Sequence, residues 1–492
     1  MSMIKAENLS FSYPGSFDPV FENVSFQIDS DWRLGFIGRN GRGKTTFLRL
    51  LMNEFEYSGR LISAVSFDYF PYHVEDGSLP SGEVLRKVCP NAENWQLMRE
   101  LSLLGIAPEL LEQSFMTLSG GEQTKALLAA LFLNEGRFLL IDEPTNHLDA
   151  EARQKVSDYL RSKAGFILVS HDRAFLDNCV DHILSINRSG IEVQSGNFSS
   201  WYESFGQRQC AEEAQNERLK KDISRLQQSA RRSSEWSARA ESAKYDTKNS
   251  GLRPDRGFVG HKAEKMMKRA KSIESRREQA ALEKSLLLKD AETADSLKLL
   301  PLVYHSERLA ELKNVSLRYD RREIVSDISF EVLQGERVAI SGRNGSGKSS
   351  VLKLILGESI DHDGTVNVSS GLVVSYVPQD SSHLCGSLSE YAREQRIDEA
   401  LLKAYLRKMD FKRTQFEKDM KDFSAGQKKK VLLAKSLCDK AHLYIWDEPL
   451  NYIDIYSRIQ IEELILENCP TLVFIEHDRS FSERIATKAV SL

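Results

Sequence analysis

The chain carries one set of short motifs twice, in the same order, and this duplication limits its architecture more than any other feature. The repeated pairs are GRNGRGKT (38–45) and GRNGSGKS (342–349), LSGGEQ (118–123) and FSAGQK (423–428), IDEPTNHLD (141–149) and WDEPLNYID (446–454), and SHDR (170–173) and EHDR (476–479). The offset stays between 304 and 306 residues along the whole set. The chain is therefore a tandem duplication, and its two copies should share one fold.

Each copy has the pattern of an α/β domain. Short apolar runs such as RLGFIG (33–38) and RFLLID (137–142) stand just before the motifs, as buried parallel strands do. Helical patterns such as QTKALLAALFL (123–133) follow the motifs. We therefore predict a first α/β domain over residues 1–205, a second over 307–492, and a linker over 206–306.

Composition excludes several classes of protein. The apolar runs, such as FILVS (166–170), are far shorter than the roughly 18–20 residues that cross a bilayer, and the N-terminal MSMIKAENLS has no apolar signal segment. The six cysteines are scattered without a CxxC pair, which argues against a disulfide framework or a structural zinc. We expect a cytoplasmic protein without membrane insertion.

The first repeated motif is a phosphate-binding loop between a strand and a helix. Its glycines let backbone N–H groups approach phosphates, and the helix N-terminus adds a partial positive charge. Lys44 and Lys348 should contact the β- and γ-phosphates of ATP. Thr45 and Ser349 should bind Mg²⁺, the expected cofactor. The other loop residues expected at ATP are Gly38, Asn40, Gly41, Gly43, Thr46, Gly342, Asn344, Gly345, Gly347 and Ser350.

A pair of carboxylates ends an apolar strand in each copy. Asp142 and Asp447 can hold Mg²⁺ through water, and the following Glu143 and Glu448 can orient or deprotonate the attacking water. A strand-end acidic pair often only faces solvent, but here proline follows in both copies and a histidine lies 28 or 29 residues further on. The histidines that could contact the γ-phosphate and its water are His171 and His477.

The LSGGEQ motif is the most specific signal. A serine before glycines at a helix start offers a hydroxyl and free amides to an anion, and it precedes the glutamate by 24 residues in both copies. With this motif the chain resembles the ATP-binding-cassette superfamily. The resemblance implies two P-loop ATPase domains stacked head to tail, with the signature of one cassette closing on nucleotide held by the other. It also implies ATP contacts from Tyr13 and Tyr319, which stack on adenine, and from Ser119, Gly120, Gly121, Ser424, Ala425 and Gly426.

The two sites should differ. Ala425 replaces a signature glycine and adds a Cβ where backbone must approach phosphate. Gln379, in YVPQ, matches the family's Mg²⁺-contacting glutamine, whereas the equivalent residue of the first copy is Tyr72, in YFPY. Both glutamates are present, so we expect two competent ATP sites with different rates.

The segment between the copies is strongly basic. Residues 218–277 hold 18 Lys and Arg against 7 Asp and Glu, in a chain of net charge -4. Apolar residues at helical spacing flank a Gly- and Pro-containing stretch, about 248–262, which indicates two antiparallel helices joined at a tip. A charged helix is usually only a solvated face, but this tip mixes arginines with an aromatic side chain, a combination suited to RNA contact. The tip residues concerned are Lys244, Lys248, Arg253, Arg256, Phe258, His261 and Lys262.

Two fused cassettes, no membrane segment and a basic helical hairpin resemble the ABC-F family of translation ATPases. That resemblance implies a monomer whose cassettes pair within the chain and whose ATP-closed form binds the tRNA exit site of the 70S ribosome. The linker then lies beside 23S rRNA and the peptidyl-site tRNA. Only 75 and 76 residues separate the loop lysine from the signature serine, so the arm insertion usual in housekeeping members is missing. In this the chain resembles Lsa/Vga-type resistance proteins, nearest the Lsa kind, which implies protection against lincosamides, pleuromutilins and group A streptogramins.

Three other functions compete with this one. A housekeeping ABC-F regulator of translation shares the same motifs and would differ in growth under lincomycin. The cytosolic ATPase subunit of a drug exporter would leave the basic hairpin without a purpose. A DNA-repair ATPase would need far longer coiled coils or zinc-binding cysteines.

Overall fold

The computed structural model describes residues 3–15, 19–187, 190–242, 272, 276, 298–319 and 322–492. It divides the chain into two compact units, one made of Met1–Trp201 with Ala294–Leu492 and the other of Tyr202–Thr293. The first unit thus holds both copies of the duplicated sequence. The divisions fall after Trp201 and after Thr293, whereas the sequence predicts a linker from 206 to 306.

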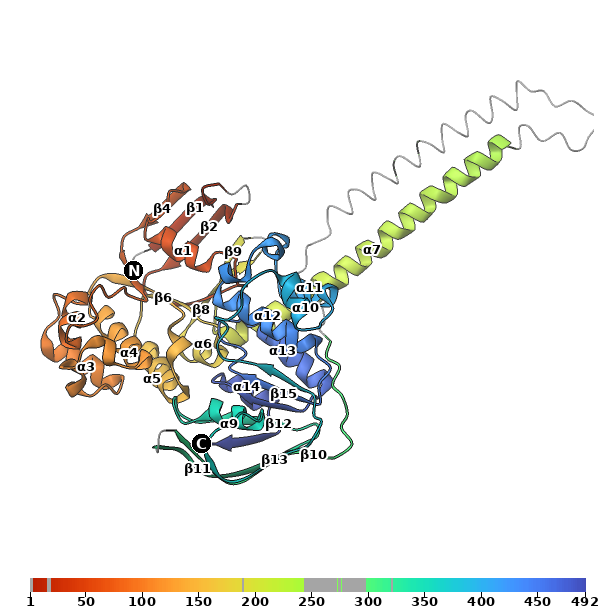
Figure 1. The fold of residues 1–492 in the computed structure, drawn as a ribbon. Helices are drawn as coiled ribbons and strands as arrows, with labels where there is room; N and C mark the ends of the chain where they lie inside the picture. The colour runs from red at the N-terminus through yellow and green to blue at the C-terminus, as the bar shows by residue number, and fades with distance from the viewer. Residues whose placement is uncertain are drawn as a thin grey trace, which may run out of the picture. The chain divides into compact units, whose positions relative to one another are not determined.

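The first copy contains two sheets, the larger one surrounded by helices (Figure 1). The larger sheet has the order β5-β6-β7-β3-β8-β9, parallel except for its last strand, and a smaller antiparallel sheet has the order β2-β1-β4. Its strands are β1 (Met3–Phe11), β2 (Phe21–Asp29), β3 (Arg33–Ile37), β4 (Ser58–Ser63), β5 (Ser66–Phe70), β6 (Arg137–Asp142), β7 (Phe166–Val169), β8 (His182–Asn187) and β9 (Gly190–Ser195). Its helices are α1 (Lys44–Leu51), α2 (Ser81–Val88), α3 (Asn94–Leu103), α4 (Gly120–Leu131), α5 (Ala150–Arg161) and α6 (Arg173–Cys179).

The second copy repeats this plan, with sheets of order β14-β15-β16-β12-β17 and β11-β10-β13. Its strands are β10 (Arg308–Tyr319), β11 (Arg322–Leu333), β12 (Arg337–Ser341), β13 (His362–Val368), β14 (Val374–Val377), β15 (Leu443–Asp447), β16 (Leu472–Ile475) and β17 (Lys488–Ser491). Its helices are α9 (Lys348–Ile355), α10 (Leu388–Glu394), α11 (Glu399–Lys408), α12 (Ala425–Cys438), α13 (Ile455–Asn468) and α14 (Arg479–Ile485). The prediction of two α/β cassettes of one fold is confirmed.

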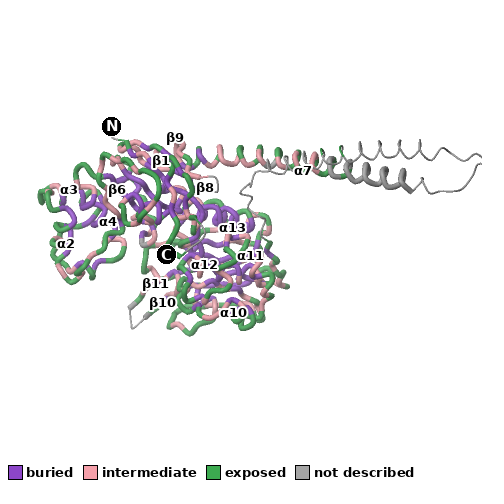
Figure 2. The backbone as a smooth tube through the Cα atoms, turned by 90° about the horizontal axis from the view of Figure 1, so that it is seen from above, coloured by how far each residue is buried: buried purple, intermediate pink, exposed green. Residues whose placement is uncertain are grey.

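Buried residues gather in the strands of the large sheets and in the helices that cover them (Figure 2). In β6 the four residues Phe138–Ile141 are buried on both faces, which explains why that strand has a continuous apolar sequence rather than an alternating one. The motifs follow the carboxyl ends of β3, β6 and β7. Because these strands are parallel, their carboxyl ends lie at one edge of the sheet and bring the motif residues together.

The second unit begins within α7 (Phe198–Ser242), a helix of 45 residues. At 1.5 Å per residue such a helix is roughly 65 Å long, more than the sequence predicts for either arm of the linker. Ser272 and Arg276 are also helical. The predicted tip, about 248–262, and all seven tip residues named above lie outside the described residues. Within the described part of the chain, no helix has the length and apolar character needed to cross a membrane.

Candidate ATP sites

The first phosphate loop joins β3 to α1, and its backbone requires its glycines. Gly41 and Gly43 have φ angles of +78° and +90°, and a Cβ on Gly43 would lie 2.6 Å from Val20 Cγ1. Lys44 is the first residue of α1, and its Nζ donates a hydrogen bond to the carbonyl oxygen of Gly38 at 2.7 Å. Burial lowers the pKa of Lys44, an effect that the carboxylate of Glu143 opposes. The buried ammonium group is therefore held across the loop where phosphate oxygens would bind.

The second phosphate loop has the same geometry. Gly347 has a φ angle of +85°, and Lys348 Nζ donates to the carbonyl oxygens of Gly342 and Arg343, both at 2.9 Å. Asn344, Gly345 and Ser350, also predicted to bind ATP, line one cavity with Lys348.

A hydroxyl meets a carboxylate at the magnesium position of each site. Thr45 Oγ1 donates to Asp142 Oδ2 at 2.8 Å, and Ser349 makes the equivalent bond to Asp447. Burial raises the pKa of both aspartates, a shift that a bound cation would reverse.

The donor set fits Mg²⁺. Asp447 Oδ1 is buried and, among the described residues, has no hydrogen-bond partner. Mg²⁺ usually binds one or two carboxylates together with substrate phosphates and water. When bound, the ion supplies positive charge that stabilises the transferring phosphoryl group.

Glu143 stands directly after β6 with its carboxylate on His171. Its φ angle is +53°, an uncommon conformation for a residue other than glycine, and its Oε1 lies 3.0 Å from His171 Nε2. Burial alone would raise the pKa of Glu143, but the charge and hydrogen bond of His171 and the charge of Lys44 hold that pKa below its usual value. Burial lowers the pKa of His171. At pH 7 the site therefore presents an ionised glutamate, which can accept a proton from water.

Glu448 occupies the same position after β15 but has more partners. Its φ angle is +47°, its Oε2 accepts from Asn451 Nδ2 at 2.6 Å, and its Oε1 lies 3.4 Å from His477 Nε2. Gln379 also bonds to this carboxylate. Burial alone would raise the pKa of Glu448, and the bond to His477 is the main influence that lowers it.

The signature of the first copy faces the phosphate loop of the second. Ser119 caps α4, accepting a hydrogen bond from the N–H of Glu122 at 3.3 Å. A cavity of about 870 Å³ is lined by Ser119–Gly121 together with Lys348, Glu448 and His477. ATP in this cavity would contact both cassettes, as the head-to-tail arrangement requires.

The first phosphate loop meets the signature of the second copy. Asn40 Nδ2 donates to the carbonyl oxygen of Tyr452 at 2.7 Å, and a Cβ on Gly426 would lie 3.2 Å from the same Nδ2. Ser424 caps α12 and Ala425 is the first residue of that helix. The alanine that distinguishes this signature is thus at the helix end that would face phosphate.

Two aromatic residues were expected at adenine. Tyr13 is 40% exposed, and its hydroxyl lies 2.7 Å from Thr46 Oγ1, on the helix that follows the phosphate loop. Tyr319 ends β10, and its side chain is outside the described part of the structure.

Sequence reasoning missed three contributors to these sites. Tyr69 donates from its hydroxyl to Asp142 Oδ2 at 3.1 Å, and Asn451 holds Glu448. The SHDR motif supplies Arg173, which forms an ion pair with the fully buried Glu462 of the other copy. The repetition of SHDR as EHDR was the available signal for the arginine, whereas nothing local marks its partner.

Comparison with known proteins supports the same type of site. A family model described as ABC transporter matches residues 21–146 and 325–451, more than half of the chain. The chain is 29% identical to the ATP-binding protein Uup of Caulobacter vibrioides, over 96% of this chain and 75% of that protein. It is 29% identical to the ribosome protection protein VmlR of Bacillus subtilis, over 96% and 84%. Identity to the energy-dependent translational throttle protein EttA of Haemophilus influenzae is 25%, over 95% and 88%.

Among solved structures, the fold is similar to that of an archaeal ribosome recycling factor, aABCE1, in complex with the ribosomal stalk protein aP1. The TM-score is 0.62 with 18% identity, covering 98% of this chain and 87% of the other. At this identity the likeness concerns the fold of the paired cassettes.

Proposed function

Because the chain belongs to the ABC transporter family and pairs two cassettes in one polypeptide, we propose that it is an ATP-hydrolysing translation factor of the ABC-F type that acts on the ribosome. The observation that carries this proposal is the second cavity, where Ser119–Gly121 lie opposite Lys348 and Glu448. A ligand touched by both cassettes favours their closed arrangement, and its loss on hydrolysis removes that preference.

The proposed reaction converts ATP and water to ADP and phosphate. Glu143 and Glu448 each hold the attacking water and accept its proton, while Lys44 and Lys348 balance phosphate charge. The histidines, His171 and His477, fix the orientation of the glutamates through the contacts described above.

The ribosome is the proposed partner for two reasons. The linker sequence carries the excess positive charge that RNA binding needs, and VmlR, a ribosome protection protein by name, aligns along 96% of the chain. We place the closed form in the tRNA exit site of the 70S ribosome in the cytoplasm. The linker would then lie near 23S rRNA and the peptidyl-site tRNA, with Arg253, Arg256 and Phe258 at its tip.

Protection from antibiotics of the peptidyl-transferase centre is the proposed outcome, in the manner of Lsa/Vga-type proteins. It rests on the similarity to VmlR and on the short spacing between Lys44 and Ser119. The similarity to EttA, a translational throttle protein by name, favours a second candidate, a housekeeping regulator of translation. Expression in a host sensitive to lincomycin separates the two, because only the first raises the inhibitory concentration.

Sedimentation with ribosomes tests the proposal directly. The Glu143→Gln, Glu448→Gln variant should stay in the closed, ATP-bound form and migrate with 70S particles in a sucrose gradient containing ATP. The matched control is Glu112→Gln, Glu463→Gln, which changes two exposed glutamates outside the cavities. If the first variant binds ATP but stays at the top of the gradient, the ribosome is not its partner.

A further inference from the structure

In the second cassette, a short irregular segment before β10 fills a groove beside α11 and the end of α12. Leu299 is 2% exposed and belongs to the apolar core of that cassette. The hydroxyl of Tyr405 donates to the carbonyl oxygen of Lys298 at 2.9 Å. The N–H of Leu302 donates to the carbonyl oxygen of Ala441 at 2.8 Å. One buried side chain and two backbone hydrogen bonds therefore anchor the segment.

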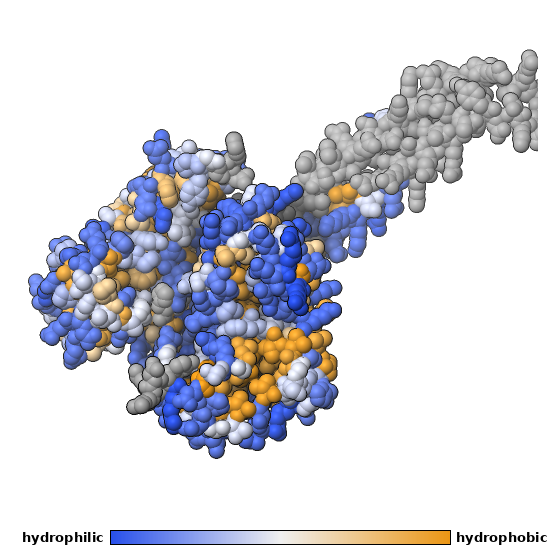
Figure 3. Space-filling model, in the orientation of Figure 1, coloured by the Kyte–Doolittle hydropathy of each residue, from blue (hydrophilic) through white to orange (hydrophobic). Residues whose placement is uncertain are grey.

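The segment presents its other apolar side chains to solvent. Leu300 and Val303 are 60% and 80% exposed, among the apolar residues that gather on the surface of the second cassette (Figure 3). Pro301 biases the residue before it toward an extended backbone. Leu299 is thus the side chain that the groove takes from this segment.

The first cassette has the same groove, because the surrounding elements correspond one to one. Helices α3 and α11 are both ten residues long, and their N-caps, Glu93 and Asp398, are 305 residues apart. The caps of α4 and α12 have the same offset. The strand edge also corresponds, since β5 pairs with β6 as β14 pairs with β15.

A hydrogen bond crosses the groove at the same place in both cassettes, with its chemical groups exchanged. Asn134 Nδ2 donates to Asp68 Oδ2 at 2.8 Å in the first cassette. Ser375 Oγ donates to Asp439 Oδ2 at 2.6 Å in the second, and Asn134 and Asp439 are again 305 residues apart. The two grooves are therefore equivalent in construction.

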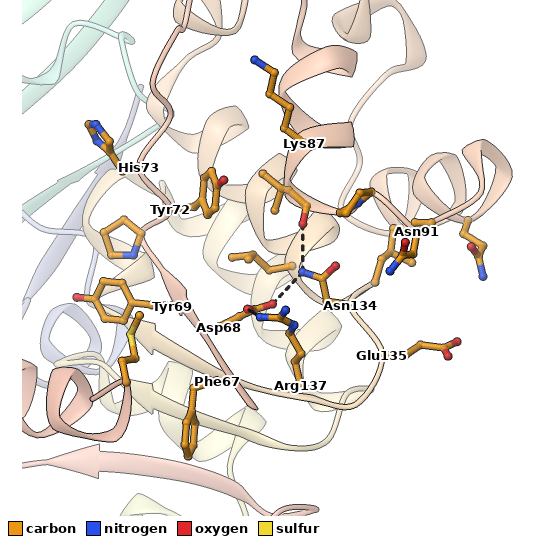
Figure 4. Close-up of a pocket in the computed structure, with 18 of the residues that line it drawn as sticks. Phe67, Asp68, Tyr69, Tyr72, His73, Lys87, Asn91, Asn134, Glu135 and Arg137 are labelled. Atoms are coloured by element: carbon orange, nitrogen blue, oxygen red, sulfur yellow. Dashed lines mark hydrogen bonds and ion pairs between the residues drawn. The ribbon is translucent and has the colours of Figure 1, made fainter. Parts of the chain in front are cut away.

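In the first cassette this groove is an open pocket of about 900 Å³ (Figure 4). All of its lining residues fall between Arg49 and Arg137, so none comes from a counterpart of the 298–304 segment. Its volume is within the range of sites that bind ligands. Figure 4 shows Asp68, Asn134 and Arg137 meeting in the pocket. Apolar side chains that line it are Met52, Phe67, Val88, Leu131 and Leu133.

We infer that this pocket of the first cassette binds an extended, leucine-bearing segment of a protein partner, in the way that the second cassette holds its own residues 298–302. The inference goes beyond the proposed action on the ribosome and does not depend on it. An apolar lining accepts the leucine side chain, and polar groups at the rim are available to the peptide backbone.

The charges of the pocket favour a peptide over RNA. Arg137 Nη1 lies 2.6 Å from Asp68 Oδ1, and Arg49 Nε lies 3.8 Å from Glu54 Oε2. The remaining ionised lining residues, Lys87 and Glu135, are of opposite sign. A pocket whose positive and negative charges balance offers little attraction to phosphates.

Fluorescence anisotropy with a defined peptide tests the inference. The probe is the labelled nonapeptide SLKLLPLVY, which is residues 296–304 of this chain, titrated with the full-length protein. We expect saturable binding that is at least ~tenfold weaker for the peptide carrying Leu299→Asp, because a buried leucine contributes more than tenfold in affinity. The protein variant Ala92→Trp, which fills the pocket from a lining loop, should bind at least ~tenfold more weakly as well.

Ala107→Trp is the matched control, since Ala107 is exposed and does not line the pocket. Both tryptophan variants should keep the ATPase rate of the parent, which shows that they fold. Absence of peptide binding, or binding that Ala92→Trp leaves unchanged, would overturn the inference. A mixed-sequence RNA decamer that binds the parent protein but not Ala92→Trp would overturn it as well, by assigning the pocket to nucleic acid.

Discussion

Replacing Glu143 and Glu448 by glutamine, singly and together, measures what each site contributes to ATP hydrolysis. Each carboxylate stands directly after a buried strand and lies within 3.4 Å of a histidine Nε2, at His171 or His477. Glutamine has the same length and can still accept a hydrogen bond from that histidine. It cannot take a proton from water, so the substitution removes the chemical step while keeping the geometry.

The expected loss follows from the protonation state of the two sites. Both glutamates have pKa values lowered below the ordinary 4.5, so each is ionised at pH 7 and its full effect as a base is available. A positioned general base contributes about 10²–10⁴-fold, which corresponds to about 2.7–5.5 kcal/mol in the activation barrier. The double variant should therefore keep at most about 1% of the parent rate. Each single variant should keep the share that the other site carries.

Steady-state release of phosphate at saturating ATP and Mg²⁺ is the assay, with Glu112→Gln, Glu463→Gln as the control. Because a lowered pKa keeps both carboxylates ionised well below neutrality, the ratio of parent to variant rates should be constant from pH 6 to pH 8. The reasoning fails if the double variant retains more than about a tenth of the parent rate, or if the ratio collapses within that range of pH.

Three further substitutions test other contacts. Glu462→Gln leaves Arg173 beside a neutral amide in a buried position, which should cost about 3–5 kcal/mol and lower the midpoint of the first calorimetric transition; an unchanged midpoint would contradict this. Asp454→Asn breaks the buried pair with Lys430, at 2.7 Å, with a similar cost. Burial opposes but Lys430 lowers the pKa of Asp454, so this loss should be complete above about pH 4 and shrink only below it. Tyr69→Phe in the Glu448→Gln background should raise the Mg²⁺ needed for half-maximal activity about 2–10-fold, and an unchanged requirement would show the hydroxyl to be dispensable.

The fold could be predicted because its signals are local and repeated. The apolar run Phe138–Ile141 has to be a doubly buried strand, and a strand that leads through glycines into a helix has to place Lys44 at the loop. Duplication then gives the second cassette at no further cost in inference. The same logic brings Asp142, Glu143 and His171 to one sheet edge, where the structure places them.

The missed contacts are those between segments with no shared pattern. Arg173 and Glu462 are 289 residues apart, and their meeting depends on how two complete surfaces fit together. The linker length differed because helical spacing weakens gradually and does not mark where α7 stops. Likewise, nothing in the sequence around Leu299 distinguishes a leucine that fills a groove from one that lies on the surface.

The unequal hydrogen bonding of the two glutamates leads to a last prediction, about which site is faster. Glu448 is held by His477, Asn451 and Gln379, whereas the counterpart of Asn451 in the first copy, Asn146, lines the second cavity instead. A side chain fixed by several partners needs less reorganisation to meet its water. The second cavity also takes the intact glycines of the first signature. We therefore expect Glu448→Gln to remove more than half of the parent ATPase rate. If Glu143→Gln removed the larger share, the alanine at the start of α12 and the looser hold on Glu143 would not limit the first site.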